Sequence, residues 1–408
     1  MPSTAPARPA RVLIVDDSPT MRSLLRSVIN SDSRLEVAGA ASDGASALRA
    51  IDSVHPDLVL LDVEMPVMDG MSTLKQMKAK GLRIPVIMCS ALTQRGAKVT
   101  IEALASGASD YVTKPSGQPS REAALHALAQ DLIPRILALT DGAPPHRDSA
   151  AVHGFRFPPA PPQKALPAET HVSQFLSQPP LSTPAPAVVL IGVSTGGPAA
   201  LDELLPLLPA GFPLPVLIVQ HMPELFTKLL AERLNDLCHL PVREATNGEP
   251  IRSGNIYVAR GDWHLEVCSS DGPASGVTST SGAAFGPSLR LTREALENHC
   301  RPAADVLFRT AVAAYGSRVL AVVLTGMGHD GLAGSRMIRE HGGTVIVQDR
   351  LTSTVWGMPG AVAEAGLANC ILPLSAIAPE ILRLAGRGQR EAHELRARGA
   401  LGIGGVMP

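Results

Sequence analysis

Residues 188–208, VVLIGVSTGGPAALDELLPLL, join an apolar run to a glycine-rich turn and then to a helical pattern. The apolar run Val188–Val193 predicts a buried strand, and the spacing of apolar residues in Ala199–Leu208 predicts a helix after it. The turn between them contains G-x-S-x-G, in the strand–turn–helix context that exposes a nucleophilic serine, here Ser194, at the top of a sheet. The amides that follow this serine at the helix N-terminus, beginning with that of Thr195, are suited to stabilise an oxyanion.

The same turn admits two other interpretations. A glycine-rich turn after a strand also cradles phosphate groups, so the motif alone leaves that alternative open. A dinucleotide site is disfavoured, because the glycines do not follow G-x-G-x-x-G and no acidic residue ends a strand about 20 residues later. The next predicted strand, Pro215–Gln220, is followed instead by His221.

A nucleophilic serine needs a base, and the base needs a carboxylate that orients it. His221 follows the strand after the serine strand, and Asp330 lies in a glycine-rich turn after the predicted strand Arg318–Leu324. We therefore predict Ser194 as nucleophile, His221 as general base and Asp330 as its orienting acid. His329 is an alternative base, but adjacent side chains in a turn usually diverge, which favours His221. The order Ser…His…Asp differs from the Ser…Asp…His order of α/β-hydrolases, so analogy with that fold does not support the assignment.

The chain before residue 143 and the chain after residue 186 both alternate short β-rich runs with helical patterns. This alternation predicts two doubly wound α/β domains, in which a parallel sheet has helices on both faces. The expected strands of the first domain are Arg11–Val15, Leu35–Ala40, Leu58–Leu61, Pro85–Cys89 and Asp110–Thr113. Those of the second are Val188–Val193, Pro215–Gln220, Ile256–Val258, Arg318–Leu324 and Thr344–Gln348. The clearest helical patterns are Thr20–Asn30, Ala45–Ser53, Ala199–Leu208, Pro223–Leu237, Ala303–Ala314 and Leu332–His341, whereas Val267–Leu291 favours a hairpin or an irregular insertion.

Charged and polar residues follow the predicted strands of the first domain. They are Asp16 and Asp17 after the first strand, Asp62 after the third, Ser90 after the fourth and Lys114 after the fifth. Because ligands bind outside the carboxyl ends of parallel strands, we expect all of them in one crevice. Mg²⁺ would relieve the repulsion among three carboxylates and keep positions open for phosphate, and an aspartate can itself form an aspartyl-phosphate. A single strand-end aspartate is more often an N-cap or a solvated charge, but the whole set favours a phosphorylation site.

The segment between the two domains has a different composition. Residues 143–186 contain the pairs Pro158-Pro159, Pro161-Pro162 and Pro179-Pro180 and no long periodic apolar segment, which is typical of an extended, semi-rigid linker. The predicted organisation is therefore a first domain at 1–142, a proline-rich linker at 143–186, a catalytic domain at 187–386 and a flexible tail at 387–408.

Composition excludes several classes of protein. The 36 Lys and Arg residues nearly balance the 37 Asp and Glu residues, which does not favour a nucleic-acid or membrane-surface partner. The longest apolar runs are far shorter than the roughly 18 residues of a membrane-spanning helix, and Met1–Arg11 has no apolar segment of the kind found in secretory signals. The 5 cysteines are scattered without a CxxC pair, so we expect free thiols in a reducing compartment, the cytoplasm.

The first domain resembles the receiver domain of two-component response regulators in the strings VLIVDDSPTMR, PDLVLLDVEMPVMDG, VIMCS and DYVTKPS, from Arg11 to about Thr140. The resemblance implies a flavodoxin-like fold that is phosphorylated with Mg²⁺ by a histidine kinase. It implies that Asp62 accepts the phosphoryl group, and that the metal is held by Asp17, by Asp16 through water, by Asp62 and by the backbone carbonyl of Glu64. It also implies that Lys114 binds the phosphate, that Ser90 tracks phosphorylation and that Tyr111 is the switch aromatic.

The second domain resembles the catalytic domain of the chemotaxis protein-glutamate methylesterases, the CheB family, from about Val188 to Leu384. The strings are IGVSTGGPAAL, VQHMPELFTKLLAERL, VVLTGMGHDGLAGSRMIREHGG and VQDRLTSTVWGMPGAV. The resemblance implies a Rossmann-like hydrolytic domain that needs no cofactor for the ester reaction and uses Ser194, His221 and Asp330. It adds the amide of Met327 as a second oxyanion donor. It implies hydrolysis of glutamate methyl esters and deamidation of glutamines on methyl-accepting chemotaxis receptors, with a receiver that obstructs the catalytic crevice until it is phosphorylated. The linker is longer than this family needs, and the tail has no counterpart in it.

Two functions of other classes compete with this prediction. A response regulator whose output domain binds DNA would need a clustered basic helix, whereas the segment with Glu224, Lys228, Glu232 and Arg233 is mixed in sign. A catalytically idle body that only binds partners or drains phosphate is disfavoured by intact Ser194, His221 and Asp330. We expect no nucleic-acid partner and no direct insertion into a membrane.

Overall fold

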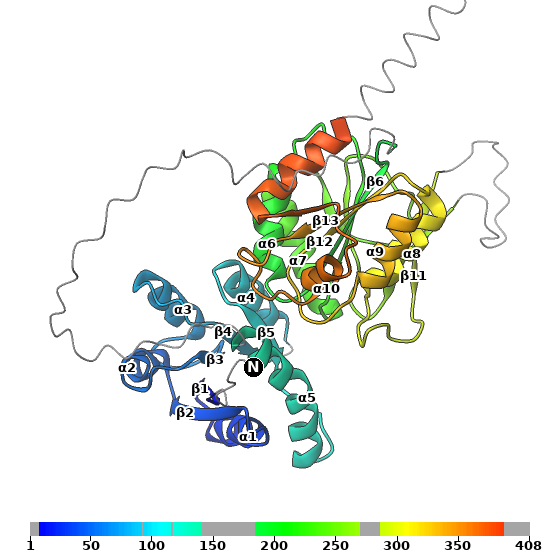
Figure 1. Ribbon diagram of the computed structural model, residues 1–408. Helices are drawn as coiled ribbons and strands as arrows, with labels where there is room; N and C mark the ends of the chain where they lie inside the picture. Colours follow the sequence, from blue (N-terminus) through cyan, green and yellow to red (C-terminus); the bar gives the residue numbers. More distant parts are fainter. Residues whose placement is uncertain (1–7, 92, 116, 141–183, 270–285, 387–408) are drawn as a thin grey trace, which may run out of the picture.

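The computed structural model describes residues 8–91, 93–115, 117–140, 184–269 and 286–386, which form two α/β domains lying against each other (Figure 1). The predicted tail and almost all of the predicted linker lie outside these residues. The three predicted boundaries between these segments therefore stay predictions. Among the described helices, none combines the length and the apolar character needed to cross a bilayer.

The first domain is built on a parallel sheet of five strands in the order β2-β1-β3-β4-β5. Its strands are β1 (Ala10–Val15), β2 (Leu35–Ala41), β3 (Leu58–Asp62), β4 (Val86–Ser90) and β5 (Asp110–Thr113). Its helices are α1 (Pro19–Ile29), α2 (Gly44–Val54), α3 (Gly70–Ala79), α4 (Gln94–Ala105) and α5 (Arg121–Thr140). The doubly wound α/β prediction is confirmed.

Two aspartates of this domain have a structural role at the start of a helix, whereas Asp62 does not. Asp43 and Asp69 are N-caps, because their carboxylates accept the amides of Ser46 and Ser72 at 2.9 and 2.7 Å. Asp62 is instead the last residue of the fully buried strand β3 and caps no helix in the described chain. A buried carboxylate that caps nothing needs another partner.

The second domain is built on a parallel sheet of seven strands in the order β14-β13-β12-β6-β7-β9-β8. The strands are β6 (Val188–Val193), β7 (Val216–Gln220), β8 (Val242–Glu244), β9 (Ile256–Val258), β12 (Val319–Val323), β13 (Thr344–Gln348) and β14 (Cys370–Leu372). The helices are α6 (Gly197–Leu204), α7 (Glu224–Leu237), α8 (Ala304–Tyr315), α9 (Leu332–Glu340) and α10 (Met358–Glu364), and residues 374–386 form a further helix. The chain runs from β6 to β7 on one side and later returns to β12 on the other. The carboxyl end of β6 is therefore a switch point of the kind where such sheets bind ligands.

Two segments of the second domain were predicted less simply than the rest, the hairpin region and the helix after Ser194. The hairpin expected within Val267–Leu291 is present as the antiparallel strands β10 (His264–Cys268) and β11 (Ser288–Thr292), although residues 270–285 between them lie outside the description. The prediction of one continuous helix over Ala199–Leu208 is wrong. Helix α6 ends at Leu204 and is followed by a 3₁₀ turn at Leu205–Leu207, because Pro206 has no N–H to continue the α-helical hydrogen bonds.

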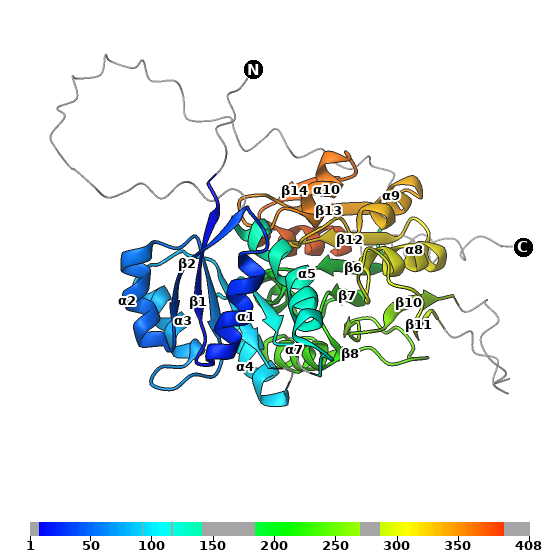
Figure 2. The same cartoon turned by 90° about the horizontal axis from the view of Figure 1, so that it is seen from below.

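The two domains pack through α4, which lies against α6 and α7 of the catalytic domain (Figures 1 and 2). Buried apolar side chains of both domains, among them Ile101 and Leu104 of α4 and Leu230 of α7, belong to one continuous cluster. Tyr111 of β5 stacks on Phe226 of α7 with ring centroids 4.5 Å apart. The receiver therefore lies on the catalytic domain with an apolar interface.

Candidate active site

Ser194 lies in a turn that only small residues allow. Its amide donates to the carbonyl of Thr325 at 3.0 Å, and its carbonyl accepts from the amide of Gly197 at 2.8 Å. Gly196 has a φ of 78°, and a side chain there would collide with Thr354. These contacts bring the start of α6 and the turn after β12 together around the serine.

The buried side chain of Gln220, the last residue of β7, donates from Nε2 to the Ser194 carbonyl at 2.9 Å. A Cβ at Gly197 would strike the Gln220 amide, so the second glycine after the serine makes room for this contact. Gln220 was not predicted as part of the site, although a glutamine at the end of an apolar strand needs a hydrogen-bond partner once it is buried.

His221 and Asp330 are brought together by neighbouring elements of the sheet. His221 follows β7, and its Nε2 lies 2.8 Å from Oδ2 of Asp330, which follows β12. Burial lowers the pKa of His221, but the hydrogen bonds with Asp330 and with Cys300 outweigh it and raise that pKa to about 9. His329, the alternative base, is exposed, and among the described residues it makes no hydrogen bond to Asp330.

The serine is not hydrogen-bonded to the histidine in this structure. Nδ1 of His221 lies 3.6 Å from Sγ of Cys300, and no hydrogen bond joins His221 to the Ser194 hydroxyl. The predicted acid and base are thus in contact, whereas the predicted nucleophile and base are not. Such contacts commonly form only when substrate binds, so their absence does not disqualify the pair.

The Asp330 carboxylate also caps the N-terminus of a helix next to the site. Helix α8 has no capping side chain of its own, and the Asp330 carboxylate accepts the first two amides of that helix, Ala304 at 2.5 Å and Asp305 at 3.0 Å. In return, the Asp305 carboxylate accepts the amide of Gly334 in α9 at 2.6 Å. Burial raises the pKa of Asp330, but the hydrogen bond from His221 and the α8 amides outweigh it and hold that pKa below its usual value.

This capping role makes a prediction about stability. We expect Asp330→Ala to lower the free energy of unfolding by about 1–2 kcal/mol, because it orphans two helix N-terminal amides. The denaturation midpoint in urea measures the effect, and Ser194→Ala, which removes no such partner, serves as the control. An Asp330→Ala midpoint equal to that of the wild type would show that the cap contributes nothing.

The two predicted oxyanion donors are the amide of Thr195, the residue after the serine, and the amide of Met327. In the described chain, no carbonyl accepts from the amide of Thr195 or of Met327. Gly326, just before Met327, packs so closely that a Cβ there would lie 2.8 Å from the Ser194 Cβ. Both amides therefore lack a hydrogen-bond partner among the described residues, and the residue before Met327 packs against the serine.

The strand-end residues of the first domain also meet. Ligand atoms of Asp16, Asp17 and Asp62 lie within 4.8 Å of one another, and Lys114 Nζ lies 2.8 Å from Asp16 and 2.7 Å from Asp62. Burial, and to a smaller degree the charge of Asp16, raise the pKa of Asp62 despite the ion pair with Lys114. Three oxygen donors of this kind fit Mg²⁺, which would relieve their repulsion, and receiver domains in general use Mg²⁺ for phosphorylation.

The other three residues predicted for the phosphorylation site lie in different surroundings. Ser90, fully buried at the end of β4, donates to the carbonyl of Ala91 at 3.2 Å. Glu64 has an exposed side chain, 3.3 Å from Arg95. Tyr111 is buried at the interface with the catalytic domain rather than near the carboxylates.

Residues of the first domain form part of the wall around His221. A cavity of about 440 Å³ is lined on one side by Tyr111 and Arg135 and on the other by His221 and Cys300. Beside it, the hydroxyl of Thr195, the residue after the nucleophile, donates to Oδ2 of Asp110 at 2.7 Å. The cavity beside His221 therefore lies between the two domains.

Comparison with known proteins agrees with this architecture. Residues 189–381 match the family model described as CheB methylesterase, and residues 12–126 match the response regulator receiver domain. A protein-glutamate methylesterase/protein-glutamine glutaminase from a Nocardioides species is 46% identical over 393 residues, 96% of this chain and 99% of that protein. The chain belongs to the CheB methylesterase family.

Two further CheB-family proteins are similar to this chain. The protein of the same name from Trichodesmium erythraeum is 44% identical over 379 residues, 92% of this chain and 99% of that protein. The crystal structure of the Thermotoga maritima CheB methylesterase catalytic domain matches at 40% identity over 49% of this chain and 99% of that chain, with a TM-score of 0.45.

Proposed function

We propose that this CheB-family enzyme hydrolyses glutamate γ-methyl esters on methyl-accepting chemotaxis receptors, releasing methanol, and deamidates specific receptor glutamines to glutamate. The observation that carries the proposal is the His221–Asp330 contact beside a serine in a G-x-S-x-G turn. It acts in the cytoplasm and serves sensory adaptation. The curated relatives carry both activities in their names.

Each member of the proposed triad has one task. The Ser194 oxygen attacks the γ-carbonyl carbon while His221 takes its proton, and the tetrahedral intermediate collapses to a glutamyl-serine as His221 protonates the leaving methoxide or amine. Water then attacks the acyl group by the same route and restores the serine. Asp330 stabilises the imidazolium that forms in each step. The Thr195 and Met327 amides donate to the oxyanion.

The same site serves both reactions because they share an acyl intermediate. An ester and an amide differ only in the leaving group, methanol or ammonia, and both leave from the same carbon. A base with a pKa raised by contact with Asp330 and Cys300 is a correspondingly better proton acceptor once it is neutral. The catalytic domain needs no cofactor for this chemistry.

Phosphorylation of the receiver is proposed to control access to the site. Asp17, Asp62, the Glu64 carbonyl and, through water, Asp16 would hold Mg²⁺, which supplies charge neutralisation between the carboxylates and the phosphoryl oxygens. Asp62 accepts the phosphoryl group from a chemotaxis histidine kinase. Lys114 and Ser90 contact that group, and Tyr111 responds to it.

Strand β5 offers a short route between the two sites. It begins with Asp110, which bonds Thr195, continues with Tyr111, which stacks on Phe226, and is followed at once by Lys114 at the acidic cluster. A phosphoryl group on Asp62 would bind Lys114. It would therefore shift the end of the strand that also makes these interface contacts. The resulting difference in domain contacts would favour the undocked state.

We expect Asp62→Asn to block Mg²⁺-dependent labelling by acetyl phosphate or by the phosphorylated kinase, because the amide cannot form the acyl phosphate. Asp17→Asn should weaken labelling by weakening metal binding. Labelling with radioactive phosphodonor measures both, with the wild type without Mg²⁺ as control. An Asp62→Asn protein labelled at the wild-type level would overturn the acceptor assignment.

A further inference from the structure

A tight turn beside the proposed triad is held in an unusual backbone conformation. Glu297 and Cys300 exchange two backbone hydrogen bonds, of 3.1 and 2.9 Å, and the residues between them, Asn298 and His299, have φ angles of 52° and 62°. Two consecutive left-handed residues characterise the turn type that favours asparagine at its first central position. Arg309 anchors the turn from α8 through two hydrogen bonds to the Glu297 carboxylate, of 2.9 and 2.7 Å.

The turn presents the Asn298 side chain to two buried carboxylates. Asn298 Nδ2 donates to Oδ1 of Asp330 and to Oδ2 of Asp305, each at 2.9 Å. Both acids are about 2% exposed, so their negative charges oppose each other with little screening by solvent. A single amide with two N–H groups is well matched to two acceptors in this arrangement.

The donors around Asp330 are divided between its two oxygens. Oδ2 receives His221 Nε2 and the amide of Ala304, whereas Oδ1 receives Asn298 and the amides of Asp305 and Gly331. Among the described residues, Asn298 is the one side chain that donates to Oδ1. Together with the two backbone amides, it holds the carboxylate on the oxygen that does not face His221.

We propose that Asn298 is a positioning residue of the esterase, whose amide keeps the Asp330 carboxylate aimed at His221. Cys300 in the same turn lies 3.6 Å from the other nitrogen of His221, so one short turn contacts both the acid and the base. The inference rests on the proposed Ser194–His221–Asp330 chemistry and assigns to it a side chain that does not touch substrate.

The turn itself offers well-matched variants. Asn298→Gly removes the amide but tolerates the left-handed φ, so the turn should persist. Asn298→Asp keeps the shape and places an acceptor where the donor stood. His299→Gly makes the same backbone change at the next residue, an exposed one with a similar φ, and leaves the amide in place.

Methanol release from methylated receptors by the full-length protein with acetyl phosphate tests the proposal. We expect Asn298→Gly to lower kcat about tenfold with KM changed less than about twofold, because an interaction with the catalytic acid is lost while substrate contacts remain. Asn298→Asp at pH 8.5 should lose at least as much. His299→Gly should stay within about twofold of the wild type, because no contact to the acids is removed.

Three outcomes would contradict parts of this account. The positioning role is overturned if Asn298→Gly keeps wild-type kcat, if Asn298→Asp is as active as the wild type, or if His299→Gly loses as much as Asn298→Gly. Ser194→Ala in the same assay separates this inference from the proposed chemistry. If the Ser194→Ala protein is active, the proposed triad is wrong. If the Ser194→Ala protein is inactive and the Asn298→Gly protein is unimpaired, only the proposed role of Asn298 is wrong.

Discussion

Ser194→Ala should reduce methanol release from methylated receptors by at least about 10⁴-fold, because without the hydroxyl no acyl-enzyme can form. The turn should survive the change, since its hydrogen bonds use the backbone of Ser194 rather than its hydroxyl. Thermal denaturation and labelling of Asp62 should therefore match the wild type. Steady-state assays over a range of receptor concentrations, with and without phosphodonor, measure the loss.

His221→Ala should be nearly as damaging, because members of a triad act as a unit. His329→Ala supplies the matched control, since His329 is an exposed histidine next to Asp330 in the chain, and its loss should change kcat by less than about threefold. Equal losses in the two histidine variants would show that the base is wrongly assigned.

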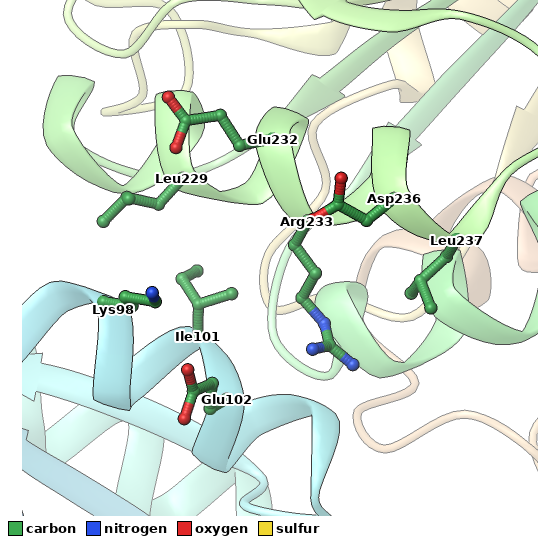
Figure 3. Close-up of a pocket in the computed structure, with 8 residues that line it drawn as sticks. All are labelled: Lys98, Ile101, Glu102, Leu229, Glu232, Arg233, Asp236 and Leu237. Carbon is green, nitrogen blue, oxygen red and sulfur yellow. The ribbon is translucent and has the colours of Figure 1, made fainter.

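Disrupting the domain interface should activate the unphosphorylated enzyme. Ile101 of α4 is 3% exposed and points towards Leu229 of α7 across a groove (Figure 3). A carboxylate at this position would have to be desolvated in the docked state but not in the undocked one, so Ile101→Glu should favour undocking. We expect about a tenfold rise in activity without phosphodonor, which corresponds to about 1.4 kcal/mol of docking energy.

The control for this variant is Val67→Glu, which makes the same change at a receiver valine that is 90% exposed. It should leave the activity without phosphodonor at the wild-type level. Ile101→Glu activity equal to that of Val67→Glu would show that the α4–α7 contact does not restrain the catalytic domain.

The strands of both sheets could be predicted from the sequence because most are short runs of fully buried apolar residues. The bounds of β5, β6, β9 and β13 agree with the expected ones to the residue. The edge strands β8 and β14 were not predicted, because each is three residues long and only partly buried, whereas the equally short β9 is a fully buried apolar run. Pro206 was overlooked as the residue that ends α6.

The meeting of His221 with Asp330, and of three aspartates with Lys114, followed from strand ends alone, since parallel strands carry their carboxyl ends to one edge. Asn298 and Cys300 lie in a turn after the hairpin, which is far along the chain from any strand end of the large sheet. No local pattern indicates that this turn contacts Asp330 and His221. The Thr195–Asp110 contact joins two domains, and docking geometry is not encoded in the local pattern of either one.

The central claim is that the docked receiver restrains a serine hydrolase and that phosphorylation of Asp62 releases it. The most direct measurement is methanol release from methylated receptors by the full-length protein and by a fragment that begins at Pro184, each with and without acetyl phosphate and Mg²⁺. We predict that the fragment is faster than the unphosphorylated full-length protein, and that phosphodonor raises the full-length protein towards the fragment while leaving the fragment and full-length Asp62→Asn unchanged. A fragment no faster than the unphosphorylated full-length protein would contradict the account.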